Sequence, residues 1–122
     1  MWDKYLNFAN YLVTLAQTQP EHVEACYRSA ISRAYYACFL RARAHVRNSN
    51  RTLTHHQAVI TWFTNHPDIQ MNKIGQMLDT MRSNRNQADY GDTIAGLERT
   101  AEHQLTLAFR TFAYMDTYQI PQ

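Results

Sequence analysis

Apolar residues recur at intervals of three and four along most of the chain, which is the spacing of helices that bury one face. No segment shows the strict alternation of polar and apolar residues that is typical of a half-buried strand. The most regular stripe lies near the C-terminus and consists of Ile94, Leu97, Ala101, Leu105, Ala108, Phe112 and Met115. The pattern therefore predicts a protein made of amphipathic helices.

Capping and breaking residues divide the first half of the chain into three predicted helices. The first spans about residues 2–17. The second starts with Pro20 in its first turn, where the missing amide proton is not needed, and reaches about residue 47. Thr54 and Gln57 then form a capping-box pattern, which predicts the start of a short third helix.

Two further helices complete the predicted bundle. The stretch His66-Pro67-Asp68 closes the third helix and opens the fourth, which runs to about Tyr90. Gly91 suits the left-handed residue after a helix end, and Asp92 suits the N-cap of the fifth helix. Because the predicted loops are short, consecutive helices should lie antiparallel. We predict an all-α fold, an antiparallel bundle of four or five helices, formed as a single domain by residues 1–122.

Composition narrows the class of protein. With 45% hydrophobic and 18% charged residues, the chain is typical of a globular domain and not of a disordered one. No apolar run approaches the roughly 18–20 residues that a membrane span needs, and the first residues lack a signal-peptide pattern.

Cys26 and Cys38 would lie about 18 Å apart on one helix, which is too far for a disulfide. We expect a cytoplasmic protein with two buried thiols.

Charge is unevenly placed, although the net charge is only +2. No acidic residue occurs between Glu24 and Asp68. The same stretch contains Arg28, Arg33, Arg41, Arg43, Arg47 and Arg51. Because guanidinium groups bind phosphate in a bidentate manner, the stretch is a candidate for nucleic-acid contact. A solvated helix face that balances acids elsewhere in the fold is the other interpretation, and the sequence leaves both open.

Residues 29–39 on the predicted second helix form the first segment of interest. Small residues at Ala30, Ala34, Ala37 and Cys38 let another helix approach closely, as a homodimer would need. A tightly packed core helix explains these residues equally well. Ser32, Arg33 and Tyr36 add polar groups along the same helix.

Residues 82–90 form the second segment of interest. Arg82, Arg85 and Asp89 share one face of the predicted fourth helix, and Asn86 and Tyr90 border that face. Arg85 also continues an apolar stripe, and a guanidinium that is buried needs a partner. Either Arg85 forms a structural pair with Asp89, or the cluster grips a phosphate; the spacing leaves both interpretations open.

These two segments carry a resemblance to a known family. The chain reads SRAYYACF at residues 32–39 and RNQADYGD at residues 85–92. In this combination it resembles the small prokaryotic HEPN proteins, which read approximately S-R-A-Y-Y-A-x-F and R-N-x-A-D-Y at these places. The resemblance covers the second to the fifth predicted helix. It implies a helical bundle that commonly dimerises and acts on RNA, in a toxin–antitoxin or defence system.

Nuclease members of the family carry an arginine, four to six residues and then a histidine, and two such motifs meet across a dimer to cut RNA without a metal. Arg85 matches the motif arginine. No histidine matches, because four intervening residues lead from Arg85 to Tyr90 and six lead from Arg82 to Asp89. Histidine transfers protons near neutral pH, whereas tyrosine, with a pKa near 10, does so poorly. RNA binding therefore follows from the resemblance more directly than RNA cleavage.

The resemblance also implies roles for the site residues. Arg85 would hold the scissile phosphate, Asn86 and Asp89 would orient it, and Tyr90 would touch the RNA. The candidate RNA- and phosphate-binding residues beside them are Arg82, Arg33, Ser32 and Tyr36.

The resemblance further implies a protein partner. Many family members are encoded beside a minimal nucleotidyltransferase, which in some pairs silences the toxin by adding AMP to a tyrosine close to the motif; Tyr90 is the tyrosine that matches here. We therefore expect a homodimer that binds RNA, with metal-independent endoribonuclease activity as a further and open expectation. The alternative is a non-catalytic module that dimerises or binds a nucleotidyltransferase, in which the arginine cluster is structural.

No cofactor and no metal site are expected from the sequence. The adjacent residues His55 and His56 point to different helix faces and cannot chelate one ion together. A zinc site that combined them with His66 and His103 would need a chance arrangement of the fold. The chain has no glycine-rich phosphate loop, no serine-nucleophile motif and no CxxC pair.

Overall fold

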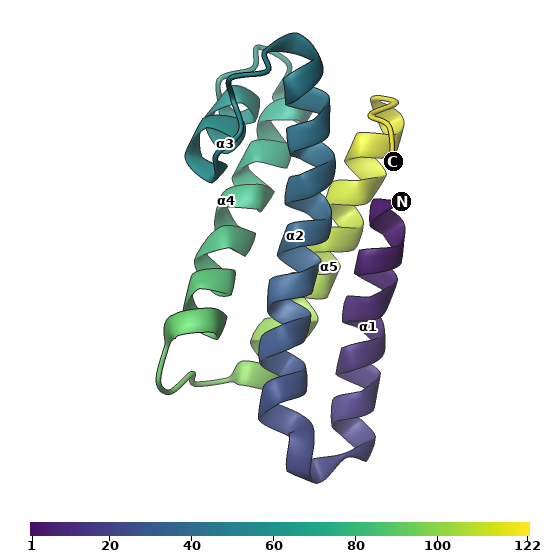
Figure 1. The fold of residues 1–122 in the computed structure, drawn as a ribbon, viewed down its shortest axis with the longest axis vertical. Coiled ribbons are helices and arrows are strands. Elements are labelled where there is room, and N and C mark those ends of the chain that lie inside the picture. The colour runs from purple at the N-terminus through teal and green to yellow at the C-terminus, as the bar shows by residue number, and fades with distance from the viewer.

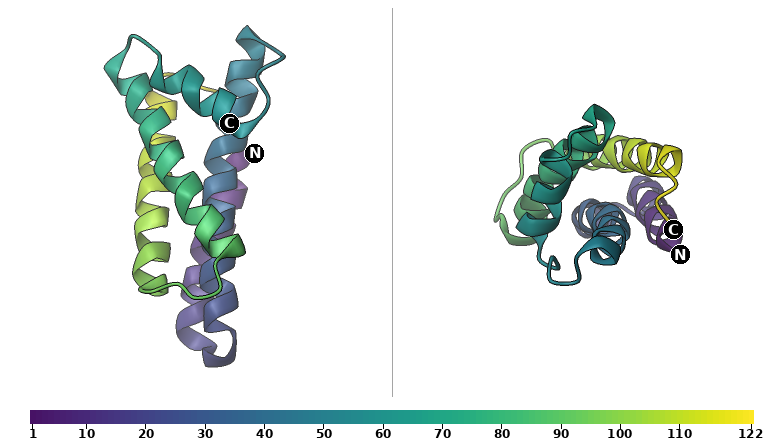
Figure 2. Two further views of the ribbon diagram at one scale, coloured as in Figure 1. Left: turned by 90° about the vertical axis from the view of Figure 1, so that its left-hand side faces the viewer. Right: turned by 90° about the horizontal axis from the view of Figure 1, so that it is seen from above.

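The computed structural model describes residues 1–122 and consists of helices and loops without a strand. The helices are α1 (Trp2–Thr18), α2 (Val23–Ser49), α3 (His56–Thr64), α4 (Ile69–Tyr90) and α5 (Leu97–Thr117), with a short 3-10 turn at Pro20–His22. The four long helices α1, α2, α4 and α5 run antiparallel in chain order, and α3 crosses from α2 to α4 near one end (Figures 1 and 2). The predicted all-α antiparallel bundle is confirmed, except that Pro20 opens the separate 3-10 turn and not α2 itself.

The central element is α2, which contacts every other helix. Its side chains at Ala30, Ala34, Ala37 and Ala42 are fully buried or nearly so, and they belong to one cluster of 30 buried hydrophobic residues. A surface without large side chains lets neighbouring backbones approach, so the small residues of α2 set the compactness of the bundle. They pack within the chain and are not available as the dimer surface that the sequence suggested.

Asp68 is the N-cap of α4 and lies in the stretch 66–68 that was predicted to open this helix. Its carboxylate accepts hydrogen bonds from the backbone N–H groups of Gln70 at 2.8 Å and Met71 at 3.3 Å. Tyr118, which follows α5, donates its hydroxyl to the same carboxylate at 2.6 Å. The hydrogen bond from Tyr118 is the main cause that lowers the pKa of Asp68. The start of α4 and the end of α5 are thereby joined.

The start of α3 differs from the prediction. The N-cap residue is His55, without a side-chain capping bond, so Thr54 and Gln57 do not form a capping box. Gln57 instead uses its side chain across the surface: its Nε2 donates to Thr61 Oγ1 at 3.1 Å, and its Oε1 accepts from Arg82 Nη1 at 3.2 Å. The hydrogen bond with Arg82 on α4 takes the place of the predicted capping box, and it connects the start of α3 to the segment at residues 82–90.

The other end of α3 lies very close to α4. A Cβ atom placed on Gly75 would lie 2.6 Å from the backbone nitrogen of Thr64, so only glycine permits this approach without a shift. Asn72 on α4 donates its side-chain amide to the carbonyl of Thr64. The two contacts hold α3 in a fixed position beside α4.

The connection between α4 and α5 also differs from the prediction. Gly91 has φ −77° and ψ 136°, which is extended and not left-handed backbone. Arg28 explains the difference, because its guanidinium donates to the carbonyls of Ala88 at 2.9 Å, Gly91 at 2.7 Å and Asp92 at 3.1 Å. These bonds satisfy the end of α4 without a left-handed turn. The N-cap of α5 is Gly96, with φ 65°, and not Asp92.

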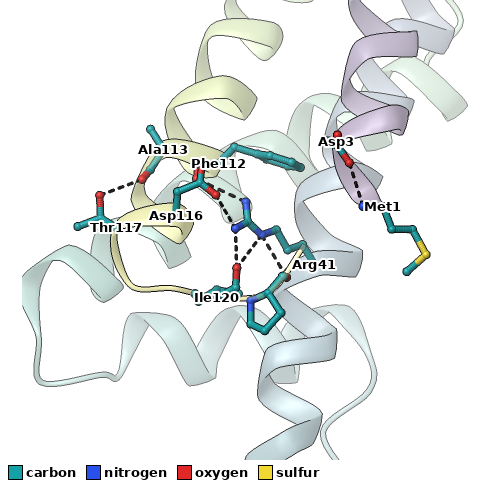
Figure 3. A network of polar contacts seen from close by, with 9 residues as sticks. Met1, Asp3, Arg41, Phe112, Ala113, Asp116, Thr117 and Ile120 are labelled. Carbon is teal, nitrogen blue, oxygen red and sulfur yellow. Dashed lines mark hydrogen bonds and ion pairs between the residues drawn. The ribbon is translucent and has the colours of Figure 1, made fainter.

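Arg41 lies inside the bundle and links α2 to the C-terminal end of the chain (Figure 3). Its Nε donates to the carbonyl of Ile120 at 3.2 Å, its Nη1 to that of Phe112 at 3.5 Å, and its Nη2 to Asp116 Oδ1 at 2.7 Å. Arg41 was one of the arginines considered for nucleic-acid contact. Its hydrogen bonds show that this guanidinium is committed to the fold.

The remaining expectations on the fold concern cysteines and membranes. Cys26 and Cys38 are free and buried, as predicted. None of the helices combines the length and the apolar character that crossing a bilayer requires.

Candidate RNA-binding site

The two sequence motifs meet where α2 packs against the C-terminal half of α4. The guanidinium carbon of Arg85 lies 5.4 Å from the ring centre of Tyr35 and 5.3 Å from that of Tyr36. Tyr35 is fully buried and Tyr36 is partly buried. Aromatic rings attract a cation that lies over their faces, so the paired tyrosines of α2 hold the Arg85 side chain in place.

Arg85 is buried without the hydrogen bonds that a guanidinium normally makes. It is only 7% exposed, and its Nε atom has no partner. Its side chain makes no hydrogen bond of normal geometry: Nη1 forms a long ion pair with Asp89 Oδ2 at 3.7 Å, and the Tyr35 hydroxyl interacts with the same guanidinium. A guanidinium has five donors, and leaving such a charged group buried and unsatisfied is costly. The arrangement is suited to an anion that would supply the missing acceptors.

Arg82, one turn earlier on α4, repeats this feature in part. Its Nη1 donates to Gln57, but its Nε is buried and has no hydrogen-bond partner. Two neighbouring guanidinium groups with unused donors favour the same ligand, a phosphate with several acceptor oxygens.

His56, at the start of α3, is a residue of this site that the sequence did not reveal. Its ring stacks on Phe39 with centres 4.1 Å apart, and its Nδ1 lies 2.6 Å from the Tyr35 hydroxyl. Burial, which is the largest cause, and the positive charges of Arg85, Arg82 and Arg43 together lower the pKa of His56 to about 4. The imidazole is therefore neutral at pH 7.

The hydroxyl that meets His56 is itself shielded from water. Burial raises the pKa of Tyr35 well above its ordinary value, although Arg82 and Arg85 oppose this effect. Tyr35 therefore stays protonated, and it links the arginine cluster of α4 to the histidine of α3.

An open groove of about 630 Å³ lies between α1, α2 and the end of α4; Arg82 and Arg85 do not line it, but Asp89, one turn after Arg85, does. The two motifs line it with Ser32, Arg33, Asp89 and Tyr90, and α1 contributes Phe8 and Leu12. Arg33 is exposed, and its Nη2 donates to Ser32 Oγ at 3.3 Å. Tyr90 is 77% exposed. The groove thus combines a cation with exposed aromatic rings, which are the groups that bind phosphates and stack on bases.

The structure brings most of the predicted site residues together, with two exceptions. Asn86 is exposed and makes no side-chain hydrogen bond or ion pair, so nothing connects it to the cluster. Arg28, considered for nucleic-acid contact, uses its guanidinium at the end of α4, as described above, and its Nε donates to Glu24. It positions Asp89 and Tyr90 and is not free for a phosphate.

Gln104 is a second residue that sequence patterns did not reveal. It is fully buried on α5, and its Nε2 donates to the carbonyls of Ile31 at 3.2 Å and Met81 at 2.9 Å. Its Oε1 accepts from Asn84 at 2.9 Å. These bonds fix α4 against α2 just before Arg85.

The site holds no set of metal ligands. No group of three or more His, Cys, Asp or Glu side chains is arranged to hold an ion.

Comparisons with known proteins agree with the geometry at the level of the family. Neither a curated protein nor a solved structure matches the chain. The family model described as the HEPN domain matches residues 6–115, which include both motifs, all of α2, α3 and α4, and most of α1 and α5. The chain therefore belongs to the HEPN domain family.

Proposed function

We propose that this protein is an RNA-binding effector of a toxin–antitoxin or defence system, and that Arg85 holds a phosphate of the RNA. One observation carries the proposal: the Arg85 guanidinium is 7% exposed, lies against two tyrosine rings and has a buried Nε without a hydrogen-bond partner. Asp89 does not satisfy it, because 3.7 Å exceeds hydrogen-bond length and the Asp89 side chain is 30% exposed. Phosphate oxygens supply the acceptors that the protein lacks.

The groove beside Arg85 extends the site from one phosphate to neighbouring nucleotides. Arg82 and Arg33 add positive charge on either side, and Ser32 adds a hydroxyl. The exposed ring of Tyr90 offers a surface on which a base stacks. The groove is open, so a single strand can pass through it.

Binding of a fluorescent single-stranded RNA by anisotropy tests the proposal. Arg85→Lys keeps the charge but loses the planar fork, and Arg85→Met loses both. We expect both variants to bind at least about tenfold more weakly, and Arg85→Met, which also loses the charge, should reduce the slope of the salt dependence by about 0.7. Arg110→Met, which removes one charge from the exposed surface of α5, is the matched control. If Arg85→Met binds RNA as tightly as the control, Arg85 does not hold the phosphate.

The assembly state is a second part of the proposal. HEPN domains commonly dimerise, and we propose that this chain forms a homodimer. Tyr5, Phe8 and Tyr11 form an exposed aromatic row on α1, which borders the groove, and aromatic rings are enriched at interfaces. Light scattering should give about twice the 14.3 kDa monomer mass at micromolar concentration, and Tyr5→Ser with Tyr11→Ser should lower it. A wild-type mass near the monomer would contradict this part.

Regulation by a minimal nucleotidyltransferase is the third part. We propose that such a partner adds AMP to Tyr90, whose side chain is accessible. Co-expression should increase the mass of the protein by AMP units, and Tyr90→Phe should abolish the increase. Tyr11→Phe, at another exposed tyrosine, is the control. An unchanged mass increase in Tyr90→Phe would place the modification elsewhere.

A further inference from the structure

His56 and Arg85 share the same pair of aromatic rings although they come from different helices. The centre of the His56 ring lies 5.6 Å from that of Tyr35 and 5.9 Å from that of Tyr36. The Arg85 guanidinium lies 5.4 Å and 5.3 Å from the same two rings. A phosphate that contacts Arg85 is therefore within a nucleotide's reach of the imidazole.

The His56 ring is fixed, with one nitrogen left free. Stacking on Phe39 with 15° between the ring planes sets its plane, and the contact of Nδ1 with the Tyr35 hydroxyl sets its rotation. Nε2 makes no hydrogen bond, and the side chain is only partly buried. No histidine follows Arg85 on α4, so His56 is the imidazole that this cluster offers for proton transfer.

We propose that His56 is a catalytic residue that takes the proton from the ribose 2′-hydroxyl when this site cleaves RNA. The proposal rests on the RNA-binding function proposed above and deepens it. The proposal requires the tautomer in which Nδ1–H donates to the Tyr35 oxygen, because this tautomer leaves the lone pair of Nε2 to accept the proton. Tyr35 orients the ring and is a positioning residue.

The reaction needs only groups that are present in the chain, the RNA and water. The 2′-oxygen loses its proton to Nε2 and forms a bond to the adjacent phosphorus, while the bond from phosphorus to the 5′-oxygen breaks. The 5′-oxygen takes a proton from water, and His56 returns its proton to solvent. The products are a 2′,3′-cyclic phosphate and a 5′-hydroxyl. Arg85 stabilises the negative charge on the phosphate oxygens as the bonds change.

The surroundings of His56 make its basicity depend on bound RNA. The groups that face it are Tyr35, Tyr36 and Arg43 from α2, Arg82 and Arg85 from α4, and His55 from its own helix. The arginines repel a proton on the imidazole and help to keep the pKa near 4. A phosphate bound to Arg85 and Arg82 neutralises this field and raises the pKa. His56 therefore becomes an effective base when the substrate is in place.

Cleavage and binding are measured separately with an RNA oligonucleotide and its 2′-deoxy counterpart, which lacks the nucleophile. His56→Asn keeps a polar atom near the Nδ1 position and removes proton transfer. We expect it to lower the cleavage rate about 100-fold or more, because general base catalysis contributes factors of this size. Its affinity for the 2′-deoxy strand should match that of wild type. His55→Asn, at the exposed neighbour, should cleave normally, and the RNA products should carry 2′,3′-cyclic phosphate ends.

The outcomes separate this proposal from the function on which it rests. Wild-type protein that binds both strands and never cleaves RNA, or His56→Asn that cleaves at the wild-type rate, overturns the role of His56 and leaves RNA binding intact. Wild-type protein that binds neither strand overturns both. If His56→Asn fails to fold, NMR titration of His56 in the wild type decides: saturating 2′-deoxy strand should raise its pKa by at least about one unit, and an unchanged pKa overturns the proposal.

Discussion

Arg41 and Arg85 are both buried in the bundle, but their guanidinium groups differ in the hydrogen bonds that the chain offers them. Arg41 is 1% exposed, lies 4.9 Å from the centre of the Phe112 ring and donates to two C-terminal carbonyls and the Asp116 carboxylate (Figure 3). Arg85 is nearly as buried and also lies against aromatic rings, yet it makes no hydrogen bond of normal geometry. Burial and aromatic contact therefore do not distinguish the two.

Hydrogen-bond satisfaction does distinguish them. Arg41 meets acceptors that the chain itself supplies, so its charge holds the C-terminal segment against α2 and α5. The carboxylate beside Arg85 belongs to the partly exposed Asp89, which forms an ion pair with Nη1 at 3.7 Å but is too distant for a hydrogen bond. A buried arginine whose donors are used belongs to the fold, whereas one whose donors are free is available for a ligand.

The largest expected effect comes from Arg41→Met. The variant leaves the buried carbonyl of Ile120, which accepts from both Nε and Nη2, without its donor, and an unsatisfied buried acceptor costs about 1–3 kcal/mol; the more exposed carbonyl of Pro121 and the Asp116 carboxylate also lose their partner. We expect a loss of at least about 3 kcal/mol and a melting temperature lower by about 10 °C or more. Thermal denaturation followed by circular dichroism measures this change. A melting temperature within about two degrees of wild type would show that the Arg41 network is not structural.

Arg85→Met should behave in the opposite way. Replacing a buried, unsatisfied charge by an apolar side chain is often neutral or stabilising, so the melting temperature should stay constant or rise. Inorganic phosphate should stabilise the wild type by about 1.4 kcal/mol at ten times its dissociation constant, and it should not stabilise the variant. Arg41→Lys, tested in the same assay, should keep its response to phosphate even though it melts earlier. A large loss of stability in Arg85→Met would assign Arg85 to the fold.

The sequence predicted the helices well because their signals are local. The stripe of α5 depends on residues three and four positions apart, and the buried positions Ala101, Leu105, Ala108, Phe112 and Met115 follow it. The start of α4 was also predicted, at the stretch 66–68, because the signal is local: Asp68 accepts from the backbone N–H groups of Gln70 and Met71 in the first turn. Helix ends that depend on distant residues were not predicted: the guanidinium of Arg28 replaces the left-handed turn at Gly91.

The site was predicted only where its residues lie in the two motifs. Arg85, Arg82 and Tyr36 follow from the spacing and the resemblance, whereas His56 has no signal of its own in the chain. It reaches Tyr35 because α3 crosses from α2 to α4, which is a property of the tertiary fold (Figure 2). Whether the donors of a buried arginine find hydrogen-bond acceptors also depends on the tertiary fold, because the acceptors of Arg41 come from the distant end of the chain.

The pH dependence of stability reports the burial of His56 and, after it, the positive charges of the arginines that surround the ring. His56 has a pKa of about 4 in the folded state and about 6.5 when unfolded, so the unfolded chain binds more protons between these values. Stability should therefore fall as the pH drops from about 6.5 to 4, with no further contribution from His56 below that. His56→Asn should reduce this slope in urea denaturation, and phosphate should do so in the wild type. Burial also lowers the pKa of His45, so His45 contributes to the slope in the same pH range. His45→Asn is the control for phosphate: the slope that remains in this variant should still respond to phosphate, whereas the slope that remains in His56→Asn should not.

The smallest effect should come from the carboxylate beside each arginine, and it tests the comparison most directly. Asp116 accepts a hydrogen bond from Arg41 at 2.7 Å, and Asp89 lies 3.7 Å from Arg85. We expect Asp116→Asn to cost about 1 kcal/mol, as for one charged hydrogen bond at a partly exposed site, and Asp89→Asn to cost about 0.5 kcal/mol or less. Asp89→Asn should also tighten RNA binding about two- to threefold, because it removes a negative charge beside the phosphate site. Urea denaturation and RNA anisotropy on the two variants measure both quantities. If Asp89→Asn proves the more destabilising of the two and weakens RNA binding, then Asp89 is the partner that Arg85 needs, and the free guanidinium no longer argues for a ligand.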